Sequence, residues 1–324
     1  MHRTTRSRST PPRGAEFFDR ESGTPTSLTL QGRQLALSNL DKVMYPKTGF
    51  TKGQVIDYYA RVAKVLLPHL KDRPLTLKRY PNGVDAEFFY EKRCPSFRPT
   101  WVKTAAIWSE RRQERIDFCL ANDLPSLIWA ANLADLELHT SLARYRNPAC
   151  PTVMVFDLDP GPGADVISCG ETALWLRKFL ADHELDCFPK TSGSKGLQVY
   201  VPLNSPVSFE QTKSFARHAA ETLTAQHPEQ VLYRMEKRLR KDKVFVDWSQ
   251  NDDHKTTVCV YSLRAREQPT VSTPIKWAEL ENAVKRRDSS SLSFVSDEVL
   301  SRIEKAGDLF EPVLTLKQKL PRTW

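Results

Sequence analysis

The feature that most constrains this chain is an apolar run that ends in two acids. Residues 153–159 read VMVFDLD, and Pro-Gly-Pro-Gly follows at 160–163. A run of apolar and β-branched residues of this length predicts a buried strand, which the Pro-Gly cluster ends. Residues two apart in a strand point to one face, so Asp157 and Asp159 project side by side. Two carboxylates this close repel each other unless a cation compensates their charge.

A divalent cation is the compensation that this pair of acids favours. Mg²⁺ prefers oxygen ligands and is commonly held by one or two carboxylates together with substrate phosphates. Asp247 ends a second β-like run and is the candidate third ligand. Three carboxylates fit a two-metal phosphoryl-transfer site. The alternative interpretation is that the two acids after residue 156 only cap the turn that follows the strand.

The charge of the chain points to a polyanionic partner. The sequence holds 48 Lys and Arg against 39 Asp and Glu, a net charge of +9. Such an excess favours a nucleic acid as partner, although it also aids solubility. Residues 233–243 carry six basic side chains just ahead of Asp247. This run is either a phosphate-neutralising edge beside a catalytic acid or a solvated basic face.

Two further segments have residues suited to a nucleotide. Residues 190–196 read KTSGSKG, and small residues let backbone N–H groups and a lysine approach a phosphate. The segment does not match the Walker pattern, so a β-turn with a solvated lysine is the alternative. Phe88 and Phe89 are adjacent on a predicted strand and therefore point to opposite faces. One can be buried while the other stacks on a base, or both belong to the core.

Periodicity predicts a mixed α/β chain with two lobes in one compact domain. Residues 1–27 form a predicted basic, flexible tail because they are too polar to bury a core. The domain spans 28–315, and 316–324 form a C-terminal tail. We expect a hairpin near 28–37, helices at 51–66, 124–138, 171–183 and 209–226, a helix end near Pro68, and strands at 75–80, 86–90, 244–248 and 259–263.

Several classes of protein are not expected. No apolar stretch is long enough for a membrane span, and the N-terminal residues lack the apolar region of a secretory signal. The six cysteines form no C-x-x-C pair, and no histidine stands at zinc-finger spacing from them. We therefore expect neither a zinc site nor a disulfide framework, and scattered thiols are typical of a reducing cytoplasm.

Taken together, these motifs resemble the polymerase domain of bacterial DNA ligase D, which belongs to the archaeo-eukaryotic primase superfamily. The resemblance covers residues 28–315, in an order that the family shares. It rests on the segments at 39–46, 58–59, 78–83, 88–92, 136–139, 156–160, 191–197, 245–247 and 261–266.

The resemblance implies both a fold and a reaction. The fold is an α/β (α+β mixed), primase-like catalytic core with an RRM-like module and a second α/β module, and the active site lies between them. In the reaction, a primer 3′-hydroxyl attacks the α-phosphate of a nucleoside triphosphate and pyrophosphate leaves. Two metal ions take part, Mn²⁺ or Mg²⁺, and family members typically accept ribonucleotides.

The resemblance also implies roles for individual residues. Asp157 and Asp159 correspond to ligands of both metals, and Asp247 to a ligand of the catalytic metal. A pocket for the 5′-phosphate beyond a gap corresponds to Asn39, Lys42 and Lys52, and helix N-termini such as that near Lys52 attract anions. The nucleotide-binding residues of the family correspond to Phe88, Phe89, Lys78, His139, Ser192, Lys195, Gln198, Arg240 and Arg264.

The sequence departs from the family pattern in two ways. The family's Gly-x-His motif reads Gly196-Leu197-Gln198 here. Glutamine donates a hydrogen bond but carries no charge, so we expect lower triphosphate affinity or a lower rate. No K-x-D-G ligase motif is present, which leads us to expect a stand-alone enzyme that hands its product to a separate ligase.

The predicted function is template-dependent filling of short gaps that carry a downstream 5′-phosphate, during DNA repair. The expected partners are gapped or broken double-stranded DNA and a separate ligase, for a monomer in the bacterial cytoplasm at the nucleoid. Three alternatives remain. One is end joining with Ku, for which residues 93–113 would align two ends. Another is primer synthesis, which needs a second nucleotide site. The last is a non-catalytic gap- or end-binding module, with Gln198 as its mark.

Overall fold

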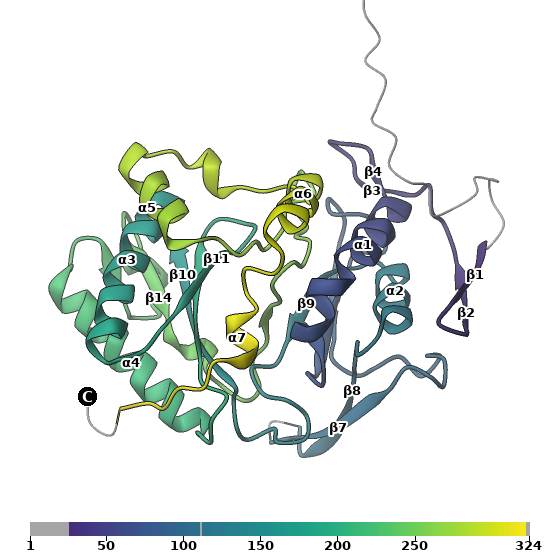
Figure 1. The fold of residues 1–324 in the computed structure, drawn as a ribbon, viewed down its shortest axis with the longest axis horizontal. Helices are drawn as coiled ribbons and strands as arrows, with labels where there is room; N and C mark the ends of the chain where they lie inside the picture. The colour runs from purple at the N-terminus through teal and green to yellow at the C-terminus, as the bar shows by residue number, and fades with distance from the viewer. Residues whose placement is uncertain (1–25, 111, 322–324) are drawn as a thin grey trace, which may run out of the picture.

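Two sheets, each covered by helices, make up the two lobes of the protein (Figure 1). The computed structural model describes residues 26–110 and 112–321. The predicted basic tail therefore lies almost entirely outside the described residues. The predicted hairpin near 28–37 is confirmed as β1 (Thr26–Leu30) and β2 (Arg33–Leu37). Among the described residues, no helix is both long and apolar enough to cross a lipid bilayer.

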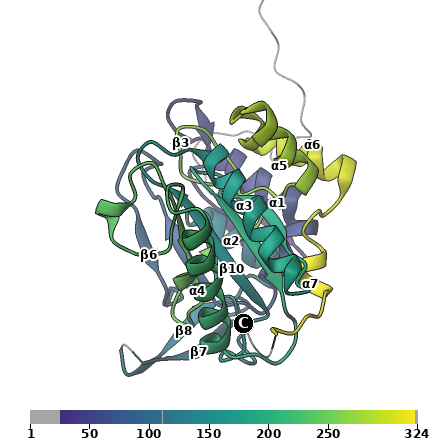
Figure 2. The ribbon, with the colours of Figure 1, turned by 90° about the vertical axis from the view of Figure 1, so that its left-hand side faces the viewer.

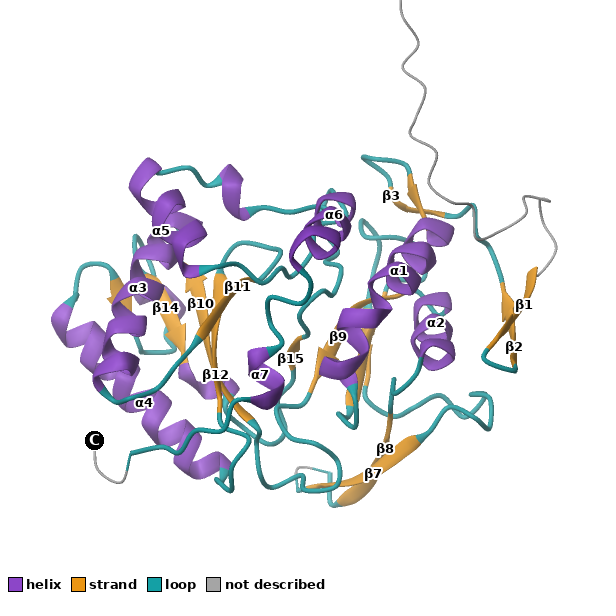
Figure 3. Ribbon diagram, viewed as in Figure 1, coloured by secondary structure: helices purple, strands orange, loops and turns teal. Residues whose placement is uncertain are grey.

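The first lobe is built on a six-stranded sheet. Its strand order is β15-β9-β5-β8-β7, and β6 pairs with β5. Two helices, α1 (Lys52–Leu70) and α2 (Leu124–Asn132), lie side by side next to this sheet (Figure 3). They share one apolar core with β5, β9 and the last residue of β8. The strands are β5 (Leu75–Arg79), β6 (Phe89–Glu91), β7 (Thr104–Ser109), β8 (Glu114–Cys119), β9 (Asp135–Thr140) and β15 (Thr257–Val258).

The second lobe is built on a five-stranded sheet in the order β11-β12-β10-β14-β13. Its central strand, β10 (Val153–Pro160), confirms the strand predicted from the apolar run. Figure 2 shows α3 (Val166–Asp182) and α4 (Phe209–Gln226) side by side against β10. The other strands are β11 (Phe188–Thr191), β12 (Leu197–Pro202), β13 (Val231–Leu232) and β14 (Val244–Asp247).

The alternation of side chains along β10 decides where its acids point. Met154, Phe156 and Leu158 are buried in the core formed with α3 and α4. Val153 and Val155 belong instead to the core of the first lobe. Asp157 and Asp159 continue that second row, so both carboxylates face the first lobe rather than the helices.

The remaining elements frame the N-terminus of α1 and join the lobes. The short strands β3 (Val43–Tyr45) and β4 (Phe50–Thr51) precede α1, and Thr51 forms its predicted cap in a capping box with Gln54. Three C-terminal helices lie across both lobes: α5 on α3, α6 on α1, and α7 on β12. They are α5 (Trp277–Arg286), α6 (Ser296–Ala306) and α7 (Pro312–Thr315), with the 3₁₀ turns η1 (Lys237–Leu239), η2 (Trp248–Gln250) and η3 (Ser290–Leu292).

Several predicted boundaries are wrong. The helix predicted over 124–138 ends at Asn132, because Ala134 adopts a left-handed φ of 60° and β9 then begins. Helix α1 continues through Pro68 to Leu70, since near its last turn the proline costs only one helical hydrogen bond. The strand predicted over 259–263 is displaced to Thr257–Val258, and Tyr261 adopts a left-handed φ of 63°. The helix predicted over 171–183 begins earlier, at Val166, where Asp165 forms its cap, and the strand predicted over 86–90 is confined to Phe89–Glu91.

The cysteines give a further correction. Cys94 and Cys119 are joined in a disulfide, with Cα atoms 4.9 Å apart, although the sequence spacing favours no disulfide framework. The bond links the segment after β6 to the last residue of β8, and both residues are buried. The contact depends on sheet pairing between segments 25 residues apart, which cysteine spacing does not encode. Cys150, Cys169, Cys187 and Cys259 are free thiols.

Candidate active site

Strand register places the predicted acids in one row. Asp157 on β10 lies directly opposite Gln198 on β12 and, on the other side, directly opposite Asp247 on β14. Asp159 follows two residues along β10, on the same face. Residues opposite each other in neighbouring antiparallel strands have Cβ atoms about 4.5–5.5 Å apart. The three acids therefore start from neighbouring positions on one face of the sheet.

The electrostatics of the pair on β10 favour a bound cation. Burial raises the pKa of Asp157 to about 7, and the neighbouring Asp159 carboxylate adds to the rise. Burial also raises the pKa of Asp159, followed by the charge of Asp247. Lys190 and Arg240 oppose these shifts only in part. Mg²⁺ and Mn²⁺ prefer oxygen ligands, which the two carboxylates supply. A bound divalent cation would also supply the positive charge that the neighbouring basic residues do not, so these residues fit a divalent metal site.

Asp247 has a second set of partners. Its Oδ1 accepts hydrogen bonds from the backbone N–H of Ser249, at 2.9 Å, and from the Ser249 hydroxyl. Its Oδ2 accepts one from Gln250 at 3.3 Å. Asp247 therefore caps η2. Within the described residues, the ligand atoms of the three acids do not all lie within 4.8 Å of one another, whereas those of Asp252, Asp253 and His254 do.

A cavity of about 560 Å³ lies between the lobes, over Asp157 and Asp159. Three buried polar atoms of residues on its wall, Thr76 Oγ1, Gln198 Oε1 and Arg264 Nε, have no hydrogen-bond partner among the described residues. Seven predicted residues line this cavity: Asp157, Asp159, His139, Ser192, Lys195, Gln198 and Arg264. The other five predicted metal and nucleotide residues do not line it: Asp247, Lys78, Phe88, Phe89 and Arg240.

The loop of residues 192–196 forms one wall of the cavity. Ser192 Oγ accepts hydrogen bonds from the backbone N–H groups of Ser194 and Gly196, at 3.2 and 3.1 Å. A Cβ atom at Gly196 would lie 2.0 Å from the carbonyl oxygen of Leu158, so only glycine fits there. Lys195 is exposed and has no hydrogen bond or ion pair within the described part of the chain. A second cavity, of about 620 Å³, opens on this loop and shares Ser194, Lys195 and Gly196.

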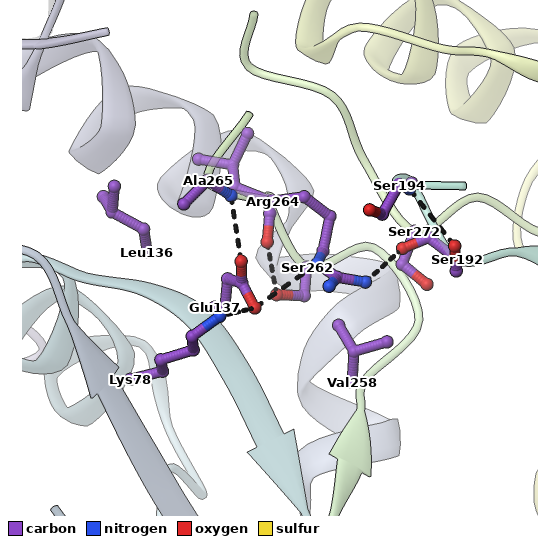
Figure 4. A network of polar contacts seen from close by, with 12 residues as sticks. Lys78, Leu136, Glu137, Ser192, Ser194, Val258, Ser262, Arg264, Ala265 and Ser272 are labelled. Atoms are coloured by element: carbon purple, nitrogen blue, oxygen red, sulfur yellow. Dashed lines mark hydrogen bonds and ion pairs between the residues drawn. The ribbon is translucent and has the colours of Figure 1, made fainter. Parts of the chain in front are cut away.

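Behind the opposite wall, Lys78, His139 and Arg264 surround one buried acid, Glu137, and of these four residues His139 and Arg264 line the cavity. Glu137 Oε2 lies 3.0 Å from Lys78 Nζ, 3.1 Å from His139 Nε2 and 3.4 Å from Arg264 Nε. Figure 4 shows Lys78 and Arg264 meeting at this carboxylate. Burial opposes its ionisation, but the His139 hydrogen bond and the charges of Arg264, His139 and Lys78 outweigh burial and hold the pKa of Glu137 well below its ordinary value.

Glu137 is the residue that sequence reasoning missed. It stands in the segment at 136–139 that supports the family resemblance, yet no role was assigned to it. The available signal was an acid inside an apolar strand, next to a predicted nucleotide-binding residue. An acid that is 2% exposed requires partners of opposite charge, and the predicted cations supply them.

The aromatic pair lies near this cluster and is not part of the core. Phe88 and Phe89 are 48% and 44% exposed, which contradicts the interpretations that bury one or both rings. Lys78 Nζ lies 4.5 Å from the Phe88 ring centroid, and the Arg79 guanidinium lies 5.1 Å from that of Phe89. The Phe88 ring also packs against the buried Tyr80. The two rings form a supported apolar surface beside the cations.

Arg240 lies behind Asp159 rather than in the cavity. Its guanidinium stacks 3.8 Å from the ring centroid of Phe245, and one N–H donates to the carbonyl oxygen of Met235. Its charge still lowers the pKa of Asp159 against the effect of burial. A Cβ at Gly161 would lie 1.7 Å from the Arg240 carbonyl oxygen, so only glycine fits at this position of the turn after β10.

The predicted phosphate residues gather at the start of α1. Lys52 is buried and its Nζ donates to the Ser38 carbonyl oxygen at 2.6 Å. Burial, then the charges of Lys42 and Arg79, lower the pKa of Lys52 to about 8. Lys42 Nζ donates to Asn82 at 2.9 Å. Asn39 has a left-handed φ of 54°, and its carbonyl oxygen accepts from the Lys42 backbone, closing a turn over the helix N-terminus.

Comparison with known proteins places this chain in a family. The family model described as LigD, primase-polymerase domain, matches residues 51–310. The multifunctional non-homologous end joining DNA repair protein LigD of Mycobacterium tuberculosis is 44% identical over 287 residues. The bifunctional non-homologous end joining protein LigD of Bacillus subtilis is 33% identical over 278 residues. The chain supplies 86% and 85% of its own length to these matches but spans only 37% and 43% of the relatives.

The structural comparison agrees with the sequence comparison. The polymerase domain of M. tuberculosis ligase D, solved in complex with DNA, superposes with a TM-score of 0.81 at 41% identity. The match covers 88% of this chain and 99% of that domain, so the two share the whole fold. The expected primase-like α/β core is thereby confirmed. The chain belongs to the LigD primase-polymerase domain family, a family of nucleotidyltransferases.

Proposed function

We propose that this protein is a template-dependent primase-polymerase that fills short DNA gaps with a downstream 5′-phosphate. One observation carries the proposal: Asp157 and Asp159 on one lobe and His139 and Arg264 on the other line the same cavity. Acids that accept metals and cations that accept phosphates are the two halves of a nucleotidyl-transfer site. The superposed domain is solved with DNA, which supports DNA as the substrate here.

The acids and the cations have separate tasks. Asp157, Asp159 and Asp247 would hold Mn²⁺ or Mg²⁺, which stabilises charge on the attacking and leaving oxygens when bound. Ser192, Lys195, His139, Gln198 and Arg264 would receive the triphosphate of a ribo- or deoxyribonucleotide, with Lys78 and Arg240 as nearby charges. In the reaction the primer 3′-hydroxyl loses its proton, its oxygen bonds to the α-phosphorus, and the bond to pyrophosphate breaks.

The DNA is held by two other surfaces. The exposed Phe88 and Phe89 rings offer a flat apolar support for the new base pair, because aromatic faces stack on any base. Asn39, Lys42 and Lys52 would bind the 5′-phosphate at the far side of the gap, where two lysines meet a helix N-terminus. The filled gap ends in a nick, which a ligase seals. We place the protein, as a monomer, at the bacterial nucleoid in the cytoplasm.

Primer extension on a one-nucleotide gap tests this function. The substrate is prepared with and without the downstream 5′-phosphate, and extension is measured in Mn²⁺ or Mg²⁺ with ribo- or deoxyribonucleotides. We expect templated insertion that the phosphate stimulates. Asp157→Ala should abolish insertion and spare gap binding, whereas the matched control Asp182→Ala, at an exposed acid on α3, should change neither. Tight gap binding without insertion under any metal would instead support a non-catalytic binding module.

A second candidate function is end joining with Ku and a ligase. The matched relatives are named as non-homologous end joining proteins, and this favours it. The segment proposed to align two ends, residues 93–113, carries Phe97 and Trp108, which are 66% and 49% exposed. Extension across two ends with short complementary overhangs would support this function. Its absence, alongside efficient gap filling, would exclude it.

A further inference from the structure

We propose that Glu137 is a positioning residue that holds Lys78, His139 and Arg264 in the arrangement that receives the triphosphate of the incoming nucleotide. The inference rests on the proposed function, because it assigns the cation wall to the triphosphate. It assigns a role to a buried acid that lies behind His139 and Arg264, which line the cavity. An acid beside a polyanion is unfavourable unless it serves the cations that bind it.

Both carboxylate oxygens of Glu137 are in use, and they have different partners. Oε1 accepts hydrogen bonds from the hydroxyl of Tyr80 at 3.2 Å and from the backbone N–H of Ala265 at 3.0 Å. These two donors are neutral and buried or partly buried, so they fix the orientation of the carboxylate. Oε2 is thereby directed at the cations. The side chain cannot rotate to serve a different partner without breaking both contacts to Oε1.

Lys78, His139 and Arg264 contact Oε2 from different parts of the fold. Lys78 on β5 lies directly opposite Glu137 on β9, and its Nζ makes a 3.0 Å contact. His139 is two residues along β9, on the same face, with Nε2 at 3.1 Å. Arg264 comes from the segment after β15, with Nε at 3.4 Å. Sheet register alone therefore does not position the set, and the shared carboxylate is the common contact.

Glu137 acts across the cleft through Arg264. The guanidinium contacts Glu137 through Nε on the first lobe and donates through Nη1 to the carbonyl oxygen of Ser192 on the second. Ser192 opens the loop that carries Lys195, and its own hydroxyl organises that loop. Figure 4 shows Arg264 extending between Glu137 and Ser192. Loss of the Glu137 charge would release one end of this connection.

Two opposing effects follow when the charge of Glu137 is removed. A more positive wall attracts a triphosphate more strongly, which favours binding. Against this, the positively charged Lys78 and Arg264 would face each other without the carboxylate between them and move apart. A neutral amide at 137 cannot satisfy three donors on one oxygen. We expect the loss of position to prevail, because removing one partner of a buried charged contact typically costs more than tenfold in affinity.

The decisive variant is Glu137→Gln, with Asp135→Asn as its matched control. Asp135 lies on the same strand, is fully buried, and contacts only the backbone N–H of Lys78. Burial raises the pKa of Asp135 well above its ordinary value, so burial disfavours the charge that the asparagine lacks. On a one-nucleotide gap, Glu137→Gln should raise the KM for the nucleotide about tenfold or more and change kcat by less than about threefold. The control should leave both constants unchanged.

Nucleotide binding is also measured directly, by calorimetry with a non-hydrolysable triphosphate and Mn²⁺. This separates the inference from the proposed function. If the wild-type protein binds the analogue but inserts no nucleotide, the proposed function fails while the role of Glu137 is still measured. An affinity of Glu137→Gln equal to or tighter than wild type would overturn the inference. An equal loss in Asp135→Asn would also overturn it, since burial alone would then explain the effect.

A double-mutant cycle tests whether Glu137 acts through Arg264. If it does, Glu137→Gln should add little to the KM of Arg264→Met, whereas independent roles would multiply the two effects. Glu137→Asp covers the case in which Glu137→Gln does not fold. It keeps the charge but withdraws the carboxylate by one methylene. A raised KM in Glu137→Asp supports the positioning role, and a wild-type KM contradicts it.

Discussion

Neutralising Asp157 should stabilise the metal-free protein while it abolishes catalysis. Burial and Asp159 raise the pKa of this carboxyl to about 7, against 3.8 in the unfolded chain. For an acid with a raised folded pKa, ionisation favours the unfolded state. At pH 8 the cost corresponds to about 4 kcal/mol, at about 1.4 kcal/mol for each pH unit between the two pKa values. Asp157→Asn removes that cost.

The assay is thermal unfolding in EDTA at pH 8 and pH 6. Allowing for relaxation around the ionised group, we expect Asp157→Asn to gain about 2–4 kcal/mol at pH 8, or roughly 3–6 °C in Tm for a chain of this size. The gain should shrink at pH 6, because the wild-type carboxyl takes up its proton below pH 7. Asp182→Asn on the surface of α3 is the control and should show no gain.

Added Mn²⁺ should reverse the order of the two proteins. A bound cation stabilises the ionised carboxylates of the wild type, whereas the asparagine variant loses a charged ligand. The reasoning would be refuted if Asp157→Asn unfolded at or below the wild-type temperature at pH 8 in EDTA. The same conclusion would follow if the two proteins had identical pH dependence, because Asp157 would then titrate in the folded state as it does in the unfolded chain.

Three other predictions follow from the site. Lys52→Met should weaken binding to a phosphorylated gap by roughly tenfold and leave binding to an unphosphorylated gap unaffected, because it removes a buried cation at the α1 N-terminus. Fluorescence anisotropy measures both affinities, and equal losses would make Lys52 a general phosphate contact. Gly196→Ala should destabilise the protein by about 2 kcal/mol or more and raise the nucleotide KM, since its Cβ would meet the Leu158 carbonyl at 2.0 Å; an unchanged Tm would show that the loop adapts. Burial lowers the pKa of His139, and Glu137 partly restores it, so this pKa should fall further in Glu137→Gln. NMR titration of the imidazole measures the change, and an unchanged pKa would mean that Glu137 does not stabilise the protonated imidazole.

Local patterns in the sequence predicted most of the elements that build the site. The alternation within residues 153–159 was sufficient to predict β10 and the shared face of its two acids. Thr51, a residue suited to a helix N-cap, and the apolar positions after it predicted the start of α1. Each signal lies within one helix turn or one strand. Side-chain direction and backbone capping depend on residues only a few positions apart, so they can be predicted from such local patterns.

Signals that depend on context were predicted poorly. The apolar segment from 124 onwards is compatible with a helix or a buried strand, and the left-handed turn at Ala134 divides it into both. The strand pattern alone did not predict that both Phe88 and Phe89 are exposed, because an aromatic pair on a strand is more often buried; only the family resemblance assigned both rings to the nucleotide. Support from Tyr80, Lys78 and Arg79 keeps the two rings at the surface.

The sequence by itself determined which chemistry is available: two acids on one strand face, a small-residue loop with a lysine, and basic residues in several segments. Only the tertiary structure decided that Asp247 lies opposite Asp157, and that Glu137 contacts Lys78, His139 and Arg264. Most of these contacts join segments that are far apart in the chain. Strand pairing and lobe packing bring them together, and both are driven by the burial of apolar side chains that carry no information about the polar partners they align.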